Sequence, residues 1–246
     1  MIILQLKEVS KHFGGLEVLS GINLEVLSGM VTSVIGPNGA GKTTLFNVIS
    51  GKFPVSSGTI HFKGRDITGL KEHEITLAGL ARSFQITNIF LNLTVWDNLF
   101  LAAQTRSPRR TRLLTPADKL DEVKERSEAI LKQIGLAPFR DTPAGQLSHG
   151  DQRHLEIGMT LATGPELLLL DEPTSGMSPA EAHQTMELIK DLSRSVTILL
   201  IEHNMDIVMN ISDRIVVLNF GRKIAEGSPE AIADDPEVCR VYLGGV

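Results

Sequence analysis

The sequence predicts an α/β fold in which helices cover a largely parallel sheet. Residues 167–170 and 196–201 are continuous apolar runs, which are typical of strands buried on both faces. Residues 179–192 lie between them and show helical spacing, so the three segments predict a β-α-β unit. In addition, the β-branched run 31–35 leads through a glycine-rich stretch into a helical pattern at 43–49.

The N-terminal segment predicts a small antiparallel sheet. Residues 3–9 and 22–26 alternate apolar and polar side chains with a period of two, as half-buried strands do. Gly14 and Gly15 lie between them and supply the turn. Further short strands are predicted at 59–62, 81–84, 215–218 and 223–225.

The middle of the chain is predicted to be mostly helical. Thr94 is a suitable N-cap for a helix over 95–104. Residues 119–134 carry spaced apolar side chains among charges, which is the pattern of an amphipathic surface helix. Another helix is predicted from Ser148 to about residue 162.

Composition limits the possible classes of protein. In 246 residues, 42% are hydrophobic and 22% are charged, and the formal charge of −5 argues against a general nucleic-acid-binding surface. The single cysteine, Cys239, excludes an internal disulfide framework and a multi-cysteine metal site. No apolar run approaches the roughly 18 residues of a membrane-spanning helix. We expect a soluble protein of a reducing compartment, most simply the cytoplasm, that is able to sit on a membrane.

The glycine-rich stretch after the 31–35 strand fits the phosphate-loop pattern G-x-x-x-x-G-K-[ST]. Glycines let backbone N–H groups approach phosphate oxygens, and the following helix directs its positive end at the same anion. Lys42 supplies a cation for the terminal phosphates, and the Thr43 hydroxyl is a ligand for Mg²⁺. We therefore expect a nucleotide to be bound by Gly36, Pro37, Asn38, Gly39, Ala40, Gly41, Lys42, Thr43 and Thr44.

Two carboxylates follow the apolar run 167–170. Asp171 is placed to hold Mg²⁺ through water, and Glu172 is placed to polarise an attacking water as general base. The alternative is a strand that merely ends in a polar turn closed by Pro173. The phosphate loop in the same chain favours the catalytic interpretation.

The segment Leu-Ser-His-Gly-Asp-Gln at 147–152 resembles the signature motif Leu-Ser-Gly-Gly-Gln of the ATP-binding cassette family of transporter ATPases. Other positions of that family match in order, and the resemblance covers essentially the whole chain. They are Phe13, the phosphate loop, Gln85, Asp171 with Glu172, and His203.

The resemblance implies a role for each of these residues. Phe13 would stack on adenine, Gln85 would sense Mg²⁺ and water while contacting the membrane partner, and His203 would contact the γ-phosphate of ATP. Ser148 and Gly150 would donate hydrogen bonds to the γ-phosphate of ATP bound by an opposite subunit. The implied catalytic residues are thus Glu172, His203, Gln85 and Lys42, and the implied Mg²⁺ ligands are Thr43, Gln85 and Asp171.

The family also implies a fold and a working unit. We expect one domain, 1–246, in which 1–87 and 161–246 form the phosphate-loop core with its small antiparallel sheet, and about 88–160 form a helical signature subdomain. ATP would join two copies, or two homologous chains, in a head-to-tail pair. The sequence departs from the family pattern at three positions that bear on closure of this pair. They are His149, Asp151 and Ser178.

Within the family, residues 81–86, 93–99, 227–230 and 242–244 resemble the ATPases of branched-chain amino-acid importers. The implied partners are two membrane-spanning permease subunits and a solute-binding protein, with no nucleic acid. The implied location is the cytoplasmic face of a bacterial membrane, as a peripheral subunit. The alternatives are the ATPase of a urea or amide importer, the ATPase of lipopolysaccharide export, an ABC ATPase acting on nucleic acid, and a solitary phosphate-loop kinase.

Overall fold

A computed structural model of the chain describes residues 1–83, 89–106 and 121–243. The predicted site residue Gln85 lies outside the described residues. So do the last residue of the strand predicted at 81–84 and the first two residues of the helix predicted at 119–134.

The larger sheet is mixed and mostly parallel. In the described part of the chain its strand order is β10-β9-β3-β8-β7-β6, and only the β9–β10 pair is antiparallel. The interior strands β3, β7 and β8 are buried along their whole length, as their uninterrupted apolar character predicts. The strands are β3 (Val31–Ile35), β6 (Leu80–Arg82), β7 (Leu167–Asp171), β8 (Thr197–Ile201), β9 (Arg214–Asn219) and β10 (Arg222–Gly227).

The smaller sheet is antiparallel, with the order β2-β1-β4-β5 among the described residues. Its first two strands are longer than the alternation predicts, because several register shifts along the β1–β2 pair interrupt the period-two pattern. Gly14, with a φ of 59°, lies in the turn between them. The strands are β1 (Ile2–Phe13), β2 (Leu16–Leu27), β4 (Ser57–Phe62) and β5 (Arg65–Asp66).

Three of the longer helices begin where the sequence predicts, because a hydroxyl side chain caps each of the three. Thr94, Ser148 and Ser178 each accept a hydrogen bond from the backbone N–H three residues later. The helices are α1 (Lys42–Ile49), α2 (Glu72–Ala78), α3 (Val95–Ala103), α4 (Asp121–Gln133), α5 (His149–Ala162), α6 (Pro179–Leu192), α7 (Met205–Ile211), α8 (Pro229–Ala233) and α9 (Pro236–Leu243). Among the helices of the described ranges, none has both the length and the apolar character needed to cross a bilayer.

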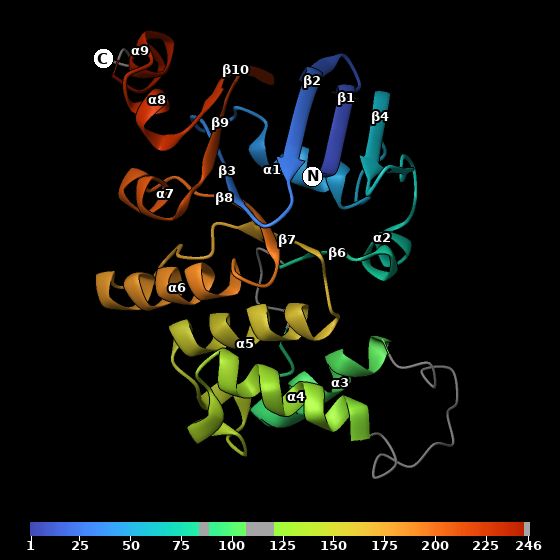
Figure 1. Cartoon of the computed structure of the whole chain (residues 1–246), viewed down its shortest axis with the longest axis vertical. Coiled ribbons are helices and arrows are strands. Elements are labelled where there is room, and N and C mark those ends of the chain that lie inside the picture. The colour runs from blue at the N-terminus through green and yellow to red at the C-terminus, as the bar shows by residue number, and fades with distance from the viewer. Residues whose placement is uncertain (84–88, 107–120, 244–246) are drawn as a thin grey trace.

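The apolar side chains pack into separate clusters. One lies around α1, between the two sheets, and includes the fully buried Phe46. A second is built from α3, α4, α5 and the segment before α5, and includes Leu99 and Leu155. Figure 1 shows α3 and α4 at one end of the molecule and β1, β2 and β4 at the other. The separate core of the helical layer supports our proposal that about 88–160 form a distinct subdomain.

Candidate functional site

The loop between β3 and α1 passes so close to neighbouring strands that two of its positions accept only glycine. Gly36 has a φ of 151°, and a Cβ there would lie 2.2 Å from the Leu218 carbonyl oxygen. Gly41 has a φ of 100°, and a Cβ there would lie 2.9 Å from a methyl carbon of Leu19. The loop is therefore held in one shape by β9 and β2, with its backbone at the carboxyl edge of the parallel sheet.

A cavity of about 210 Å³ lies on this loop. Its lining contains the loop residues from 38 to 44 that the sequence predicts, together with one of the two predicted carboxylates. The lining residues are Val18, Asn38, Gly39, Ala40, Gly41, Lys42, Thr43, Thr44 and Glu172. The fold thus brings the general-base candidate to the predicted phosphate site, although more than 120 residues separate them in sequence.

The Lys42 ammonium lies inside this loop. Its Nζ donates to the carbonyl oxygens of Gly36 at 2.7 Å and Pro37 at 3.0 Å. Burial lowers the pKa of Lys42, and the nearby carboxylates of Glu172 and Asp171 oppose that effect by favouring the charged form. The Lys42 ammonium and the Asp171 and Glu172 carboxylates therefore lie close enough at the end of β7 to interact electrostatically.

Asp171 ends β7 and is fully buried. Its Oδ2 accepts a hydrogen bond from Arg82 Nη2 at 2.7 Å, and its backbone carbonyl accepts one from Arg153 Nη2 at 2.7 Å. Arg82 also donates to Asn47 Oδ1 on α1 at 2.7 Å. Sequence reasoning missed both arginines, because no local pattern marks an arginine that packs against a strand far away in the chain.

The donor set fits Mg²⁺. Asp171 Oδ1 is buried and has no hydrogen-bond partner among the described residues, while the Thr43 side chain is exposed in the first turn of α1. Mg²⁺ is usually held by one or two such protein oxygens, with water and phosphate oxygens completing its shell. The described ranges contain no group of three or more His, Cys, Asp or Glu side chains suited to a metal.

Glu172 has a backbone conformation that is rare for a side chain with a Cβ. Its φ is 46°, in the left-handed region, and its N–H donates to the Ile201 carbonyl oxygen at 2.9 Å. Glu172, in this turn, lines the phosphate-loop cavity. Such strain persists only where surrounding structure enforces it, and it is concentrated at functional sites.

The signature segment forms the start of α5. The Ser148 hydroxyl accepts from the Asp151 N–H at 3.1 Å and donates to Asp151 Oδ2 at 2.8 Å. Gly150 is buried against the Glu181 side chain, where an added Cβ would lie 3.2 Å from Glu181 Cγ. Hydrogen bonds from Ser178, and a smaller one from the Gly150 amide, lower the pKa of Glu181. Of the departures from the family pattern, Asp151 thus bonds within this segment, and Ser178 bonds to Glu181, which contacts the segment.

Seven of the predicted site residues that the structure describes do not line the phosphate-loop cavity: Phe13, Gly36, Pro37, Ser148, Gly150, Asp171 and His203. The Phe13 ring is 42% exposed and packs edge-on against Phe53, with 5.4 Å between the ring centres. His203 lies two residues after the end of β8, and its side chain is 59% exposed. Ser148 is exposed at the start of α5.

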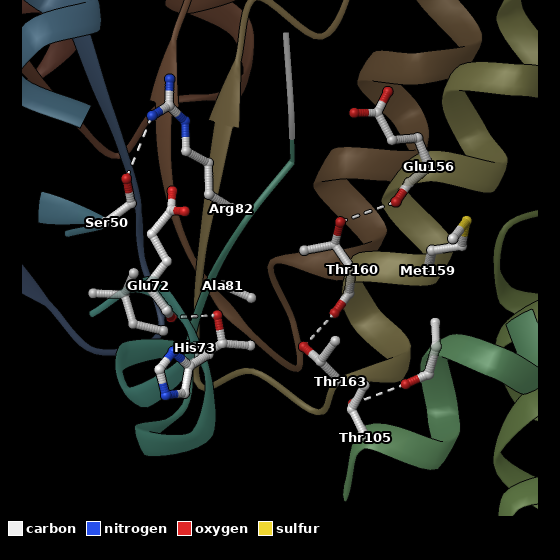
Figure 2. A pocket seen from close by; sticks show the side chains of 13 residues that line it. Ser50, Glu72, His73, Ala81, Arg82, Thr105, Glu156, Met159, Thr160 and Thr163 are labelled. Atoms are coloured by element: carbon white, nitrogen blue, oxygen red, sulfur yellow. Dashed lines mark hydrogen bonds between the residues drawn. The ribbon is translucent and has the colours of Figure 1, made fainter. Parts of the chain in front are cut away.

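A second cavity, of about 370 Å³, lies between the core and the helical layer. Figure 2 shows Glu72, His73 and Arg82 on one side of it and Glu156 and Thr160 on the other. Its walls come from α2, β6, α5 and the end of α3, which are far apart in sequence. Sequence reasoning did not find this cavity, because α2 was not predicted.

Two family models match this sequence. The model for ABC transporters matches residues 19–175, which is more than half of the chain. The model for branched-chain amino acid ATP-binding cassette transporters matches residues 222–246. The first match includes the phosphate loop, the signature segment and both carboxylates, and the second covers the C-terminal tail.

Curated relatives match over nearly the full length. The high-affinity branched-chain amino acid transport ATP-binding protein BraF of Pseudomonas aeruginosa is 42% identical over 250 residues, covering 98% of each chain. LivG of Escherichia coli K12, which has the same description, is 41% identical over 249 residues with the same coverage. The probable LivG protein of Archaeoglobus fulgidus is 37% identical, covering 99% of this chain and 96% of the relative.

Solved structures match in fold. An ATP-binding cassette of an ABC transporter in its ADP conformation superposes with a TM-score of 0.88 at 35% identity, covering 99% of both chains. A dimeric cassette in a post-hydrolysis state with ADP and Pi has a TM-score of 0.78 at 25% identity, covering 92% of this chain and 99% of that one. These matches confirm the predicted fold class and the sequence resemblance. The chain belongs to the ATP-binding cassette transporter family, among the ATP-binding proteins of branched-chain amino acid transport.

Proposed function

We propose that this chain is the ATP-hydrolysing subunit of an importer of branched-chain amino acids. The observation that carries the ATPase part is that Lys42 and Glu172 line one phosphate-loop cavity, with Asp171 close enough to favour the charged form of Lys42. The transported solute is inferred from the relatives, whose descriptions name branched-chain amino acid transport, and from the match of the C-terminal tail.

Hydrolysis would proceed by positioning and charge compensation, since phosphoryl transfer needs little covalent chemistry from the protein. Backbone N–H groups of the loop and the Lys42 ammonium hold the phosphates of ATP. Glu172 accepts a proton from the attacking water, and His203 contacts the γ-phosphate and orients that water. Asp171 and Thr43, with Gln85, would hold Mg²⁺, which when bound neutralises charge on the phosphate oxygens.

Two copies, or this chain and a homologue, would close head to tail around ATP. The start of α5 presents the exposed Ser148 hydroxyl at the positive end of the helix, which suits a phosphate held by a facing subunit. Moving a pair from 1:99 open to 99:1 closed takes about 5.5 kcal/mol of differential affinity. Ser148 and Gly150 at two sites offer about four hydrogen bonds to a charged group, each contributing roughly 1.5–3 kcal/mol.

Replacing Ser148 with arginine is expected to block this closure. The long cation removes the hydroxyl donor and fills the space in front of α5, while the phosphate loop of the same chain is untouched. Light scattering with ATP in the non-hydrolysing Glu172→Gln background should then detect monomers, although calorimetry still detects ATP binding. As a control, Ser195→Arg places the same side chain on an exposed residue next to the amino end of β8. ATP-dependent dimers of the Ser148 variant would contradict the proposed role of Ser148 in closing the dimer around ATP.

The proposed membrane partners are two permease subunits that meet the chain at the cytoplasmic face of the membrane, with a solute-binding protein outside. The cavity between α2, β6 and α5 supports a docking surface for them, because it joins the core to the helical layer. Uptake of labelled leucine and of labelled urea, in cells with and without this gene, tests the solute. Loss of leucine uptake alone supports the proposal, and loss of urea uptake alone would replace it with the urea-importer alternative.

A further inference from the structure

Glu202 lies at the point where two loops of the candidate site run side by side. The strands β7 and β8 pair in parallel with Asp171 opposite Ile201, so Glu172 and Glu202 each begin the loop that follows. The backbone bond from Glu172 to the Ile201 carbonyl continues this pairing past the end of β7. Beyond this bond the pairing between β7 and β8 ends, so the two loops that follow are held together by the Glu202 side chain.

The Glu202 carboxylate joins the two loops. One oxygen, Oε1, accepts a short hydrogen bond from the Thr174 hydroxyl and another from the Thr174 N–H at 3.3 Å. The other, Oε2, accepts from the N–H groups of His203 at 2.9 Å and Asn204 at 3.4 Å. Four donors from both loops thus occupy the acceptor positions of a single carboxylate.

Burying the charged Glu202 carboxylate costs folding free energy unless hydrogen bonds compensate for its lost hydration. Glu202 is fully buried, and in the described ranges no lysine or arginine lies within ion-pair distance of it. A buried carboxylate without a fixed cation is tolerated only when hydrogen bonds replace its water shell, as they do here. Its four bonds fix the direction of two loops, which an apolar side chain of similar size would not do.

The same carboxylate faces the His203 ring. Oε2 lies 3.7 Å from His203 Nδ1, so this edge of the imidazole is turned toward Glu202 and Nε2 is directed away from it. The ring is 59% exposed, and the Glu202 carboxylate is a charged group next to it. The second loop held by Glu202 carries Thr174, two residues after Glu172.

We propose that Glu202 is a positioning residue for ATP hydrolysis. Its carboxylate holds the His203 loop and the loop after Glu172 in one arrangement, so that the histidine and the general base meet the same γ-phosphate. This inference rests on the roles proposed above for His203 and Glu172. Glu202 itself does not line the phosphate-loop cavity.

The first test is Glu202→Gln in the full-length chain. The amide keeps the size of the side chain but must turn an NH₂ group toward one pair of N–H or O–H donors. We expect kcat to fall about tenfold or more while ATP affinity by calorimetry stays unchanged. Glu166→Gln, the same substitution at an exposed glutamate, serves as the matched control and should keep the wild-type kcat. Wild-type kcat in Glu202→Gln would overturn the inference.

Thr174 provides a second variant in case Glu202→Gln fails to fold. Thr174→Val removes the hydroxyl donor to Glu202 with almost no change in shape, whereas Thr174→Ser keeps that donor. We expect the valine variant to lose kcat and the serine variant to retain it, with similar thermal unfolding temperatures for both. Equal kcat in the two variants would contradict a role for this hydrogen bond.

A double-mutant cycle separates positioning from general stability. Because Glu202 acts partly through His203 and partly through the loop after Glu172, the double variant Glu202→Gln/His203→Ala should hydrolyse ATP more slowly than His203→Ala, but by less than the loss that Glu202→Gln causes alone. A double variant slowed by the full product of both losses would overturn the inference and leave the proposed function standing. A wild-type rate in His203→Ala would instead remove the role of His203 in the proposed function, and the inference with it.

Discussion

Glu172→Gln should reduce steady-state ATP hydrolysis by about a hundredfold or more while ATP still binds. Glutamine has nearly the same size and keeps an oxygen in the cavity, but it cannot accept a proton from water. Glu172 lines the phosphate-loop cavity, and its carboxylate lies close enough to Lys42 to favour the charged form of that lysine. Because ATP then persists between the subunits, the closed dimer should accumulate. Phosphate release measures the rate, and size-exclusion chromatography with ATP measures the dimer.

Two further results would sharpen this test. Glu187→Gln, on the exposed face of α6, should leave hydrolysis unchanged and so controls for loss of a negative charge. A Glu172→Gln protein that hydrolyses ATP at close to the wild-type rate would exclude Glu172 as the general base. In that case Asp171 would not be the obvious replacement, since its Oδ2 is already bonded to Arg82.

Lys42→Ala should weaken ATP binding by about tenfold to a hundredfold. The ammonium donates hydrogen bonds at the centre of the loop, and a hydrogen bond to a charged group contributes roughly 1.5–3 kcal/mol. Loss of the charge also removes the cation close to Asp171 and Glu172. The phosphates of ATP would then meet a more negatively charged site. Isothermal titration calorimetry with ATP measures this affinity directly.

The control for this variant is Lys52→Ala, an exposed lysine just beyond the end of α1. It removes the same charge without touching the loop and should bind ATP as the wild type does. An unchanged affinity in Lys42→Ala would show that the loop backbone alone holds the nucleotide. Thermal unfolding without nucleotide distinguishes weaker binding from a damaged fold.

The elements that the sequence predicts well are those with a single dominant signal. The strand around 167–170 is apolar on every residue because helices cover both faces of its sheet, and Ser148 marks the start of α5 because its hydroxyl caps it. The helices α2 and α7 escaped prediction. Each has seven residues, too few for a helical period to emerge from the pattern.

The candidate site likewise contains some features that the sequence predicts and others that it does not. The phosphate loop is local, and its glycines are required by close approaches that occur within one strand-to-helix turn and its neighbours. In contrast, Arg82, Arg153 and Glu202 act through contacts with residues from other segments, and nothing near them in sequence distinguishes them from ordinary charged residues. The positive φ of Glu172 is also invisible in the sequence, because it follows from how β7 ends against β8.

The bond from Arg153 to the Asp171 carbonyl has a consequence for communication between two subunits. Arg153 belongs to α5, the helix whose first residues would grip the neighbour's nucleotide, yet it is fastened to the strand that serves its own nucleotide. A displacement of the start of α5 would therefore be transmitted through this bond to the end of β7. In a dimer, this hydrogen bond would couple the nucleotide site of each subunit to ATP binding in the other subunit. The two sites could then hydrolyse ATP in a coordinated way.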